Sequence, residues 1–547
     1  MNNIENNIKE ALQAAIKKAF DNNIPIAELF IELPKDKNHG DYATNVAMQL
    51  AKTLQRKPRE VAEMIIASLD CQTANIEACE VAGPGFINFT MNNDSLTSVI
   101  KLVLQEQENY GRSNFGQKEK YNLEFVSANP TGDLHPGHAR GAAMGDSVAR
   151  IMEFAGYDVT REYYINDAGN QIGNLALSIQ ARYYQHFNKK AEMPQDGYHG
   201  RDIIAIAEKL ASEIGDKYLD LAPEESLAYF REYGLKSGLE KIEKTLATFQ
   251  VYFDVWSSEQ HLYDQGMVEK TLELLSEKGV TYQEDNALWL RTTDFGDDKD
   301  RVLIKSDGSY TYITPDIAYH MDKFARGFDK LVDFLGADHH GYIERLKAAI
   351  EALGRSRDDL SVDIIQMVRM VKDGAEYKMS KRTGNALSLD DLMEEAGVSA
   401  IRYMFASKAA DTHMDLDLDM AIKQSNDNPV YYVQYAHARL CSIMRNIVDF
   451  REPARYNLLT HEKEVELMKQ INEFTKVVNE AAKSRQPHKI CNYVHKLASL
   501  FHSFYAECKV ITDDSDLQNQ RVALVKAAEI TIKNALNLIG VEAVERM

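Results

Sequence analysis

The segment Tyr121-Asn122-Leu123-Glu124-Phe125-Val126-Ser127 predicts a β-strand, and the loop His135-Pro136-Gly137-His138 follows shortly after it. Residues 138–154 then have the spacing of a long helix, Gly156 is placed to end that helix, and residues 159–165 form another β-type run. Strand, helix and strand in this order make the βαβ unit of a parallel sheet. We therefore predict an α/β fold whose central domain is a doubly wound, Rossmann-like parallel sheet.

Changes of pattern divide the 547 residues into three regions. Residues 1–117 mix helical and alternating patterns, which predicts an α+β domain. Residues 118–424 form the predicted sheet domain, with a largely helical insertion at about 175–290, and residues 425–547 predict an all-α helix bundle. Further strands of the sheet domain are expected at Arg301–Ile304, Lys330–Leu335 and Asp363–Val371.

The composition, 44% hydrophobic and 27% charged, is that of a globular protein, and no apolar stretch is long enough for a bilayer. Five scattered cysteines form no metal-binding spacing, and no tightly bound metal is expected. The N-terminus lacks the features of a signal peptide, so we expect a cytoplasmic protein without a membrane partner. A net charge of -20 disfavours a nucleic-acid partner in general, but the stretch after Asn426 is nearly balanced in charge, which leaves a local basic face possible.

His135-Pro136-Gly137-His138 lies where the first strand of the sheet meets its first helix, a position at which doubly wound folds bind phosphates. Pro136 stiffens the turn, Gly137 permits a close approach of the backbone, and both imidazoles can donate hydrogen bonds to oxygens that gain charge. The alternative is a polar helix cap without catalytic function. The strand before the loop and the helix after it favour the phosphate site.

A second polar segment, residues 374–385, carries Lys378, Lys381 and Arg382 around a serine. Two lysines three residues apart beside glycines form a cationic clamp for a polyphosphate and can neutralise a leaving group. A solvated basic loop is the alternative. The imidazole pair in the other half of the same domain favours the clamp.

These two segments resemble the two signature motifs of class I aminoacyl-tRNA synthetases, and further motifs narrow the resemblance to arginyl-tRNA synthetases. Those motifs are His39–Asn45, Glu124–Gly132, Tyr163–Gln171, Asn428–Arg439 and Glu545–Met547. The resemblance spans the chain and is weakest in the insertion. It implies that ATP, as its Mg²⁺ complex, activates L-arginine, and that the arginyl group is then transferred to the terminal adenosine of tRNA(Arg). A monomer is the family expectation.

A pocket for arginine needs carboxylates for the guanidinium and an aromatic or amide wall. By resemblance, Glu124, Tyr312 and Asp316 line the side-chain pocket, while Ser127 and Asn129 hold the amino and carboxylate end. Tyr312 and Asp316 share one face of a helix if Thr314 is its cap. Helix capping is the competing role for Asp316, and both roles can coexist.

The resemblance assigns the remaining roles in the catalytic domain. His135, His138, Lys378 and Lys381 are the catalytic candidates, with the imidazoles at the pentavalent phosphate and the lysines at the leaving pyrophosphate. ATP is bound by His135, Gly137, His138, Gly336, Asp338 and Lys381, and His340 belongs to the arginine site. His339 and His340 are equally compatible with ordinary polar turn residues.

RNA is commonly recognised through unstacked bases that stack on aromatic side chains, and the predicted bundle is rich in tyrosine. By resemblance, Tyr432, Tyr435, Tyr505 and Met547 contact the anticodon loop, and residues 1–117 contact the outer corner of the tRNA. The alternative is that these tyrosines fill the core of the bundle.

Three rival functions make different predictions. A small nucleotidyltransferase would lack the helical C-terminal third, and a silent tRNA-binding paralogue would lack Lys381 or a histidine. A class I synthetase for another amino acid would have no use for the acidic pair Glu124 and Asp316. We therefore expect an arginine-tRNA ligase.

Overall fold

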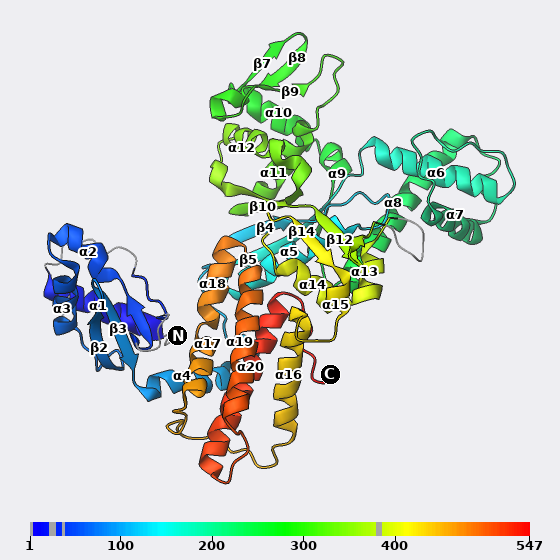
Figure 1. Cartoon of the computed structure of the whole chain (residues 1–547). Helices are drawn as coiled ribbons and strands as arrows, with labels where there is room; N and C mark the ends of the chain where they lie inside the picture. The colour runs from blue at the N-terminus through cyan, green and yellow to red at the C-terminus, as the bar shows by residue number, and fades with distance from the viewer. Residues whose placement is uncertain (1–3, 21–28, 35–38, 379–385) are drawn as a thin grey trace.

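The computed structural model describes residues 4–20, 29–34, 39–378 and 386–547, and for residues 338–340 it describes the backbone alone. Figure 1 shows a small N-terminal module at one side, a central sheet with two appended subdomains, and a bundle of long helices. None of the helices in the described ranges is both long and apolar enough to cross a membrane. The sequence-based fold, an α/β domain between an α+β module and a helix bundle, is confirmed.

The N-terminal module is a three-stranded antiparallel sheet in the order β1-β3-β2, packed against helices. Its elements are α1 (Ile4–Ala19), β1 (Tyr42–Thr44), α2 (Val46–Leu54), α3 (Pro58–Ser68), β2 (Ile76–Ala82) and β3 (Phe86–Met91). The apolar face of α1, with Ile8 and Leu12, is fully buried in this module. The next helix, α4 (Asn93–Glu106), joins two cores, because Leu96 belongs to the core of the module and Val99 to that of the main body.

The central sheet has five parallel strands in the order β11-β10-β4-β5-β6. The strands are β4 (Lys120–Glu124), β5 (Asp158–Ile165), β6 (Val255–Ser258), β10 (Lys330–Gly336) and β11 (Leu360–Ile365). Helix α5 (Pro136–Phe154) connects β4 to β5, as the sequence predicts. It lies so close to the sheet that a Cβ at Gly145 would be 2.3 Å from the ring of Phe125. The strand order reverses between β4 and β10, which is where doubly wound folds bind ligands.

Two expectations for this region are wrong in detail. β6 lies inside the expected insertion of residues 175–290 but pairs with β5, so that segment is interrupted by a strand of the main sheet. Arg301–Ile304 is a strand, β9, but it belongs to a separate antiparallel sheet with β7 (Thr281–Glu284) and β8 (Ala287–Leu290). Strands of four residues are too short for their pattern to indicate which sheet they join.

The helices around the sheet fall into two groups. The first subdomain contains α6 (Asn170–His186), α7 (Arg201–Ile214) and α8 (Pro223–Thr248), and the second contains α9 (Glu259–Asp264), α10 (Met267–Glu277), α11 (Ile313–Ala325) and α12 (Ile343–Ala352). Figure 1 shows these groups projecting from the sheet in different directions, with the β7-β8-β9 sheet at the tip of the second.

The expected strand at Asp363–Val371 is two strands, β11 and β12 (Val368–Lys372). β12 forms a small sheet with β13 (Ala375–Glu376) and β14 (Met414–Asp417). Three helices, α13 (Leu389–Ala396), α14 (Val398–Ala406) and α15 (Leu418–Ile422), lead from this sheet to the bundle.

The bundle contains α16 (Pro429–Arg445), α17 (Glu462–Asn472), α18 (Phe474–Ser484), α19 (His488–Glu507) and α20 (Ser515–Leu538). Three long helices are expected from the sequence in this region. The expected bounds are Val430–Phe450, Glu462–Lys483 and Lys489–Lys509. The second of these is divided into α17 and α18, and α20 is additional. Because α20 has buried residues on nearly all sides, its sequence lacks a clear apolar stripe.

A buried arginine joins the bundle to the helix that begins at the histidine pair. Arg402 of α14 is fully buried and donates hydrogen bonds to the carbonyl oxygens of Ile539 and Phe249, both at 3.0 Å. Its guanidinium also pairs with the buried carboxylate of Asp146 in α5, at 2.5 Å. Arg402 therefore connects the middle of α5 to the residue that follows α20.

Candidate active site

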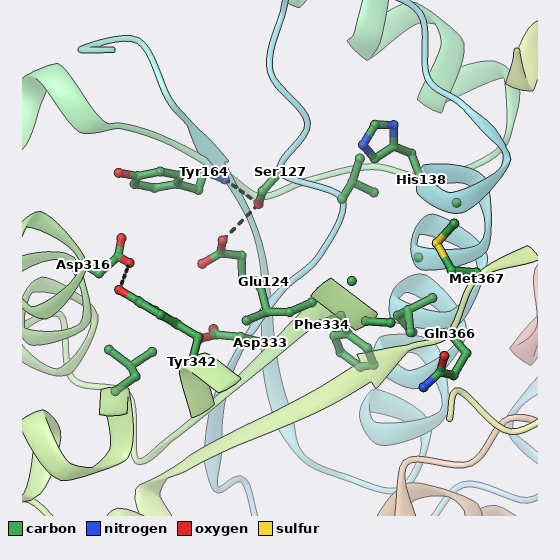
Figure 2. Close-up of a pocket in the computed structure, with 18 of the residues that line it drawn as sticks. Glu124, Ser127, His138, Tyr164, Asp316, Asp333, Phe334, Tyr342, Gln366 and Met367 are labelled. Atoms are coloured by element: carbon green, nitrogen blue, oxygen red, sulfur yellow. Dashed lines mark hydrogen bonds between the residues drawn. The ribbon is translucent and has the colours of Figure 1, made fainter. Parts of the chain in front are cut away.

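A cavity of about 700 Å³ opens at the carboxyl ends of β4 and β10, where the strand order reverses. Its walls come from the carboxyl ends of β4, β5, β10 and β11, from the loop after β4 and from the first two turns of α5 and α11. Figure 2 shows the carboxylate of Asp316 on one side, His138 and Met367 on the other, and Glu124 between them. A cavity of this size holds a small-molecule ligand.

The histidine pair caps the helix and still presents donors to the cavity. Nδ1 of His135 accepts hydrogen bonds from the backbone N–H groups of Gly137 and His138, at 3.0 and 3.3 Å. Nδ1 of His138 accepts one from the backbone N–H of His135, at 3.3 Å. A ring nitrogen that accepts carries no proton, so in each neutral imidazole the proton is on Nε2. Both Nε2 atoms are therefore hydrogen-bond donors.

Burial keeps these imidazoles neutral. It lowers the pKa of His135, and it lowers the pKa of His138 to about 4, an effect to which the neighbouring His135 adds. The two rings stack with centroids 3.6 Å apart. At neutral pH the pair can thus stabilise anionic oxygens by hydrogen bonding and not by positive charge. The polar cap and the donor site, which the sequence leaves as alternatives, coexist in the same residues.

The turn after β4 has an unusual backbone. Val126 and Ser127 have positive φ angles of 70° and 38°, a region that β-branched residues rarely occupy. The hydroxyl of Ser127 holds the turn, because it accepts from the backbone N–H of Tyr164 at 3.1 Å and donates to Glu124 at 3.0 Å (Figure 2). Both turn residues line the cavity. Strained backbone of this kind clusters at binding sites, and sequence reasoning missed it here.

The two acidic residues expected for arginine both line the cavity. Glu124 ends β4, and Asp316 lies in the first turn of α11. Tyr342 donates a hydrogen bond to Asp316 (Figure 2). Burial raises the pKa of Asp316 to about 6; the hydrogen bond from Tyr342 and the charge of His320 oppose this increase, and the charges of Glu124 and Glu259 add to it. Thr314 does not cap α11, because its hydroxyl donates to the carbonyl oxygen of Leu303 instead.

Glu124 belongs to a charged network that the sequence did not predict, and two other members of this network, Asp333 and His320, also line the cavity. Lys323 is fully buried, and its Nζ donates to Glu124 at 2.6 Å and to Asp333 at 3.1 Å. Nε2 of His320 lies 2.8 Å from the other oxygen of Asp333. A carboxylate within the apolar strand β10 and a lysine seven residues after Asp316 on one helix are signals that could have indicated it.

Other expected residues have different positions. Tyr312 is 90% exposed and its side chain does not line the cavity. Asn129 is half-buried outside the lining and donates to Gln171 at 2.7 Å. Gly336 is part of the lining. The side chains of Asp338 and His340 lie outside the description, although their backbone forms the short 3₁₀ helix η4 (Ala337–Tyr342).

The second basic segment is anchored beside the first motif at its two ends. Lys381 and Arg382 lie outside the described residues. Lys378 is exposed and pairs with Glu376 at 3.2 Å. The backbone N–H of Leu387 donates to the carbonyl oxygen of Lys378 at 3.1 Å, and that of Leu389 donates to the carbonyl oxygen of Leu134 at 2.7 Å. Leu134 directly precedes His135, so the base of the segment adjoins the histidine pair.

The aromatic residues predicted for tRNA form one group on α16 and α19. The ring of Tyr432 stacks on His495 at 4.9 Å, and both Tyr432 and Tyr435 contact the ring of His502. Tyr435 is 36% exposed. Tyr505 lies under the guanidinium of Arg439 at 4.4 Å from the ring centre, and Met547 is 57% exposed. This group is partly accessible and is not simply the core of the bundle.

The parallel sheet and its histidine pair lie within a region, residues 99–441, that matches the family model described as tRNA synthetases class I (R), catalytic domain. Fold and site thus define a class I aminoacyl-tRNA synthetase. Residues 6–91 match the arginyl tRNA synthetase N terminal domain, and residues 433–547 match the DALR anticodon binding domain. The chain belongs to the arginyl-tRNA synthetases: it uses ATP to charge tRNA with arginine.

Individual relatives are similar along the whole chain. It is 55% identical over 555 residues to arginine--tRNA ligase 1 of Halalkalibacterium halodurans, with 100% of each chain covered. It is also 55% identical over 546 residues to arginine--tRNA ligase of Bacillus subtilis, with 99% of this chain and 98% of the relative covered. The structure of arginyl-tRNA synthetase from Thermus thermophilus superposes with a TM-score of 0.78 at 22% identity, over 99% of both chains. That likeness supports the fold.

Proposed function

We propose that the guanidinium of arginine binds between Glu124 and Asp316 and that ATP lies over the histidine pair. The observation that carries this assignment is that one cavity is lined both by carboxylates, Glu124 and Asp316 among them, and by two imidazole donors. A guanidinium presents donors in a planar fork that matches carboxylates, and a phosphate accepts hydrogen bonds from neutral Nε2–H groups. Ser127, at the strained turn between them, is placed for the amino end of the amino acid. Asn129 and His340 complete the proposed arginine site.

In the first step, an oxygen of the arginine carboxylate attacks the α-phosphorus of ATP. A new P–O bond forms, the bond to the β-phosphate oxygen breaks, and pyrophosphate leaves with its electron pair. The Nε2–H groups of His135 and His138 donate to the oxygens that gain charge, while Lys378 and Lys381 neutralise the pyrophosphate. Mg²⁺ enters on the ATP phosphates as part of the substrate. No protein nucleophile is required, because positioning and charge supply the catalysis.

Gly137, Gly336 and Asp338 complete the proposed ATP site. Gly137, in the first turn of α5, and Gly336, at the end of β10, offer backbone in the cavity lining. In the second step, the 2′-hydroxyl of the terminal adenosine attacks the carbonyl carbon of the arginyl adenylate, and AMP leaves. This regiochemistry follows the class I resemblance.

The partly accessible aromatic group of the bundle is proposed to bind unstacked bases of the tRNA. Tyr432, Tyr435 and Tyr505 lie in this group together with Arg439, and Met547 is exposed at the C-terminus. Stacking on aromatic rings and a guanidinium does not require a positive chain, which reconciles RNA binding with a net charge of -20. We also propose that the enzyme acts as a monomer in the cytoplasm. All five cysteines are free, which suits a reducing compartment.

Arginine-dependent exchange of pyrophosphate into ATP, measured with and without tRNA, tests the proposal. Lys381→Ala is expected to lower the exchange rate about 100-fold without weakening arginine binding, because the lysine acts on the leaving group. Lys378→Ala is the matched comparison and is expected to have the smaller effect, since Lys378 already pairs with Glu376. Equal losses of rate and arginine affinity in the Lys381 variant would contradict its role.

A further inference from the structure

The carboxylates on the arginine side of the cavity belong to a continuous network of buried charges. Asp333 and Glu124 are neighbours across the parallel pair β10 and β4. Nζ of Lys323 bridges them, at 3.1 and 2.6 Å, and is completely buried. His320, one turn earlier on α11, lies with Nε2 2.8 Å from the second oxygen of Asp333. The network therefore contains two acids and two basic side chains.

The geometry around His320 fixes its protonation. Nε2 faces the carboxylate of Asp333, and Nδ1 lies 2.7 Å from the carbonyl oxygen of Asp316. Both of these oxygens are acceptors, so both ring nitrogens have to carry protons for the contacts to be hydrogen bonds. Burial alone would lower the pKa of His320, but the charge of Asp333 outweighs it and the pKa is raised. His320 is thus an imidazolium, and the network of two acids and two cations is neutral.

One carboxylate of the lining remains without a cationic partner. Asp316 has no ion pair with a lysine or arginine within the described ranges, and its carboxylate accepts a hydrogen bond from the hydroxyl of Tyr342. Two further acids surround the site without lining it. Glu162 pairs with Arg326 at 2.8 Å, and Glu259 lies beside the hydroxyls of Tyr164 and Tyr263. The three lining acids Glu124, Asp333 and Asp316, together with His320 and with Lys323 behind the lining, therefore carry a net charge of minus one.

We propose that Lys323 and His320 are positioning residues for arginine recognition: together with the three acids of the lining they leave this end of the cavity with one net negative charge, which a single guanidinium neutralises. The inference rests on the proposed placement of arginine between Glu124 and Asp316. With both cations in place, Glu124 and Asp333 are ionised before the substrate arrives. Arginine then binds at neutral pH without moving a proton onto or off the protein.

Removing either cation should couple arginine binding to proton release. In Lys323→Met, Glu124 and Asp333 lose their bridge and are left with one cation. Two carboxylates this close and this buried cannot both ionise easily, so they take up a proton. The guanidinium has to displace that proton. His320→Asn removes the other charge but keeps an N–H donor for Asp333, and it is expected to have the same consequence.

The experiment is calorimetric titration of L-arginine into the full-length enzyme at pH 7, in two buffers of different ionisation enthalpy. The wild type is expected to release fewer than about 0.2 protons, and each cation variant more than about 0.5, as expected for a displaced carboxyl proton. The arginine Kd of the variants should also weaken about tenfold between pH 8.5 and pH 6.5, against less than about twofold for the wild type. Arg326→Gln is the matched control, because it removes a cation from α11 whose partner Glu162 lies outside the lining.

Several results would overturn the inference. Release of nearly one proton by the wild type would show that the lining is not balanced, and this measurement needs no variant to fold. Folded variants that bind arginine without proton release would show a purely structural role. Proton release by Arg326→Gln would show a general effect of losing charge from α11. Unchanged arginine binding in both Glu124→Gln and Asp316→Asn would instead refute the proposed arginine site itself.

Discussion

Replacing Asp316 by asparagine removes the one carboxylate of the lining that no lysine or arginine of the described chain pairs with, while keeping the shape of the side chain. A charge-assisted hydrogen bond contributes about 1.5–3 kcal/mol, and leaving one partner of a buried pair without the other costs about 3–5 kcal/mol. Asp316 is only partly buried, so we expect a loss of about 2–4 kcal/mol in arginine binding. That corresponds to a Kd about 30- to 1000-fold higher.

The same substitution should abolish a pH dependence. Because burial raises the pKa of Asp316 to about 6, the carboxyl group of the free wild-type enzyme becomes protonated as the pH falls through 6. Arginine keeps its charge in this range, so its Kd should rise about tenfold for each pH unit below 6 and stay constant above 7. Asp316→Asn has no group to titrate there, and its weaker binding should be independent of pH between 5 and 8.

Direct titration of arginine, without ATP or tRNA, measures both effects. Asp322→Asn is the matched control, since it makes the same substitution on α11 at a residue that pairs with Arg326 and does not line the cavity. The raised pKa of Asp316 also affects the free energy of unfolding. The folded state holds this proton more tightly than the unfolded chain does, so the fold loses stability as the pH rises from about 4 to 6. Asp316→Asn should therefore melt at a higher temperature than the wild type at pH 7.5. An arginine Kd within threefold of the wild type, with the inflection near pH 6 retained, would refute the assignment.

Three other predictions concern the histidine pair, a glycine and the bundle. His138→Asn keeps an acceptor for the helix cap but loses the Nε2 donor, so it should lower the rate of pyrophosphate exchange about 100-fold with an unchanged melting temperature. His138→Gln should be the more active and the less stable of the two variants. The opposite ranking would contradict the roles of the two ring nitrogens. Gly540→Ala should cost more than about 2 kcal/mol in thermal unfolding, since φ is +62° and the new Cβ would be 2.3 Å from Arg402, whereas Gly279→Ala, with φ of +71° and nothing within 4 Å, should cost only about 1 kcal/mol. Tyr435→Ala should weaken tRNA binding about tenfold and Tyr435→Phe should not, because stacking needs the ring alone; equal losses in a filter-binding assay would indicate that the hydroxyl is what matters.

The sequence predicts the parts of the fold that are local. β4 and α5 follow from a short apolar run, a proline and glycine turn and a helical period, and Glu124 and His138 are found at the ends of these elements as expected. The strand order of the sheet is not local. Parallel strands pair across long connections, so nothing in the pattern of Val255–Ser258 indicates that it joins β5.

The charge network could not be predicted either, because it also depends on which strands pair. Asp333 and Glu124 are 209 residues apart in the chain, and they become neighbours only when β10 pairs with β4. Lys323 then acquires its partners from two strands at once. An aspartate in an apolar run and a lysine on a helix can signal a buried charge, but neither indicates the partner that it meets in the fold. Tyr312 is the opposite case: the resemblance places it in the arginine pocket, but its side chain is 90% exposed.

The histidine pair shows why a structural role and a catalytic role need not compete. Capping uses Nδ1 of each ring as an acceptor for the backbone of the first turn of α5. That use decides the tautomer, because the single proton of a neutral imidazole is left on Nε2. Arg402 and Asp146 hold the same helix from its middle, so the helix that carries the two donors is anchored in the fold. If these backbone hydrogen bonds to Nδ1 were lost, a freed ring could carry its proton on Nδ1, and its Nε2 would then no longer donate. Loss of the cap is therefore expected to lower the rate of arginine activation as well.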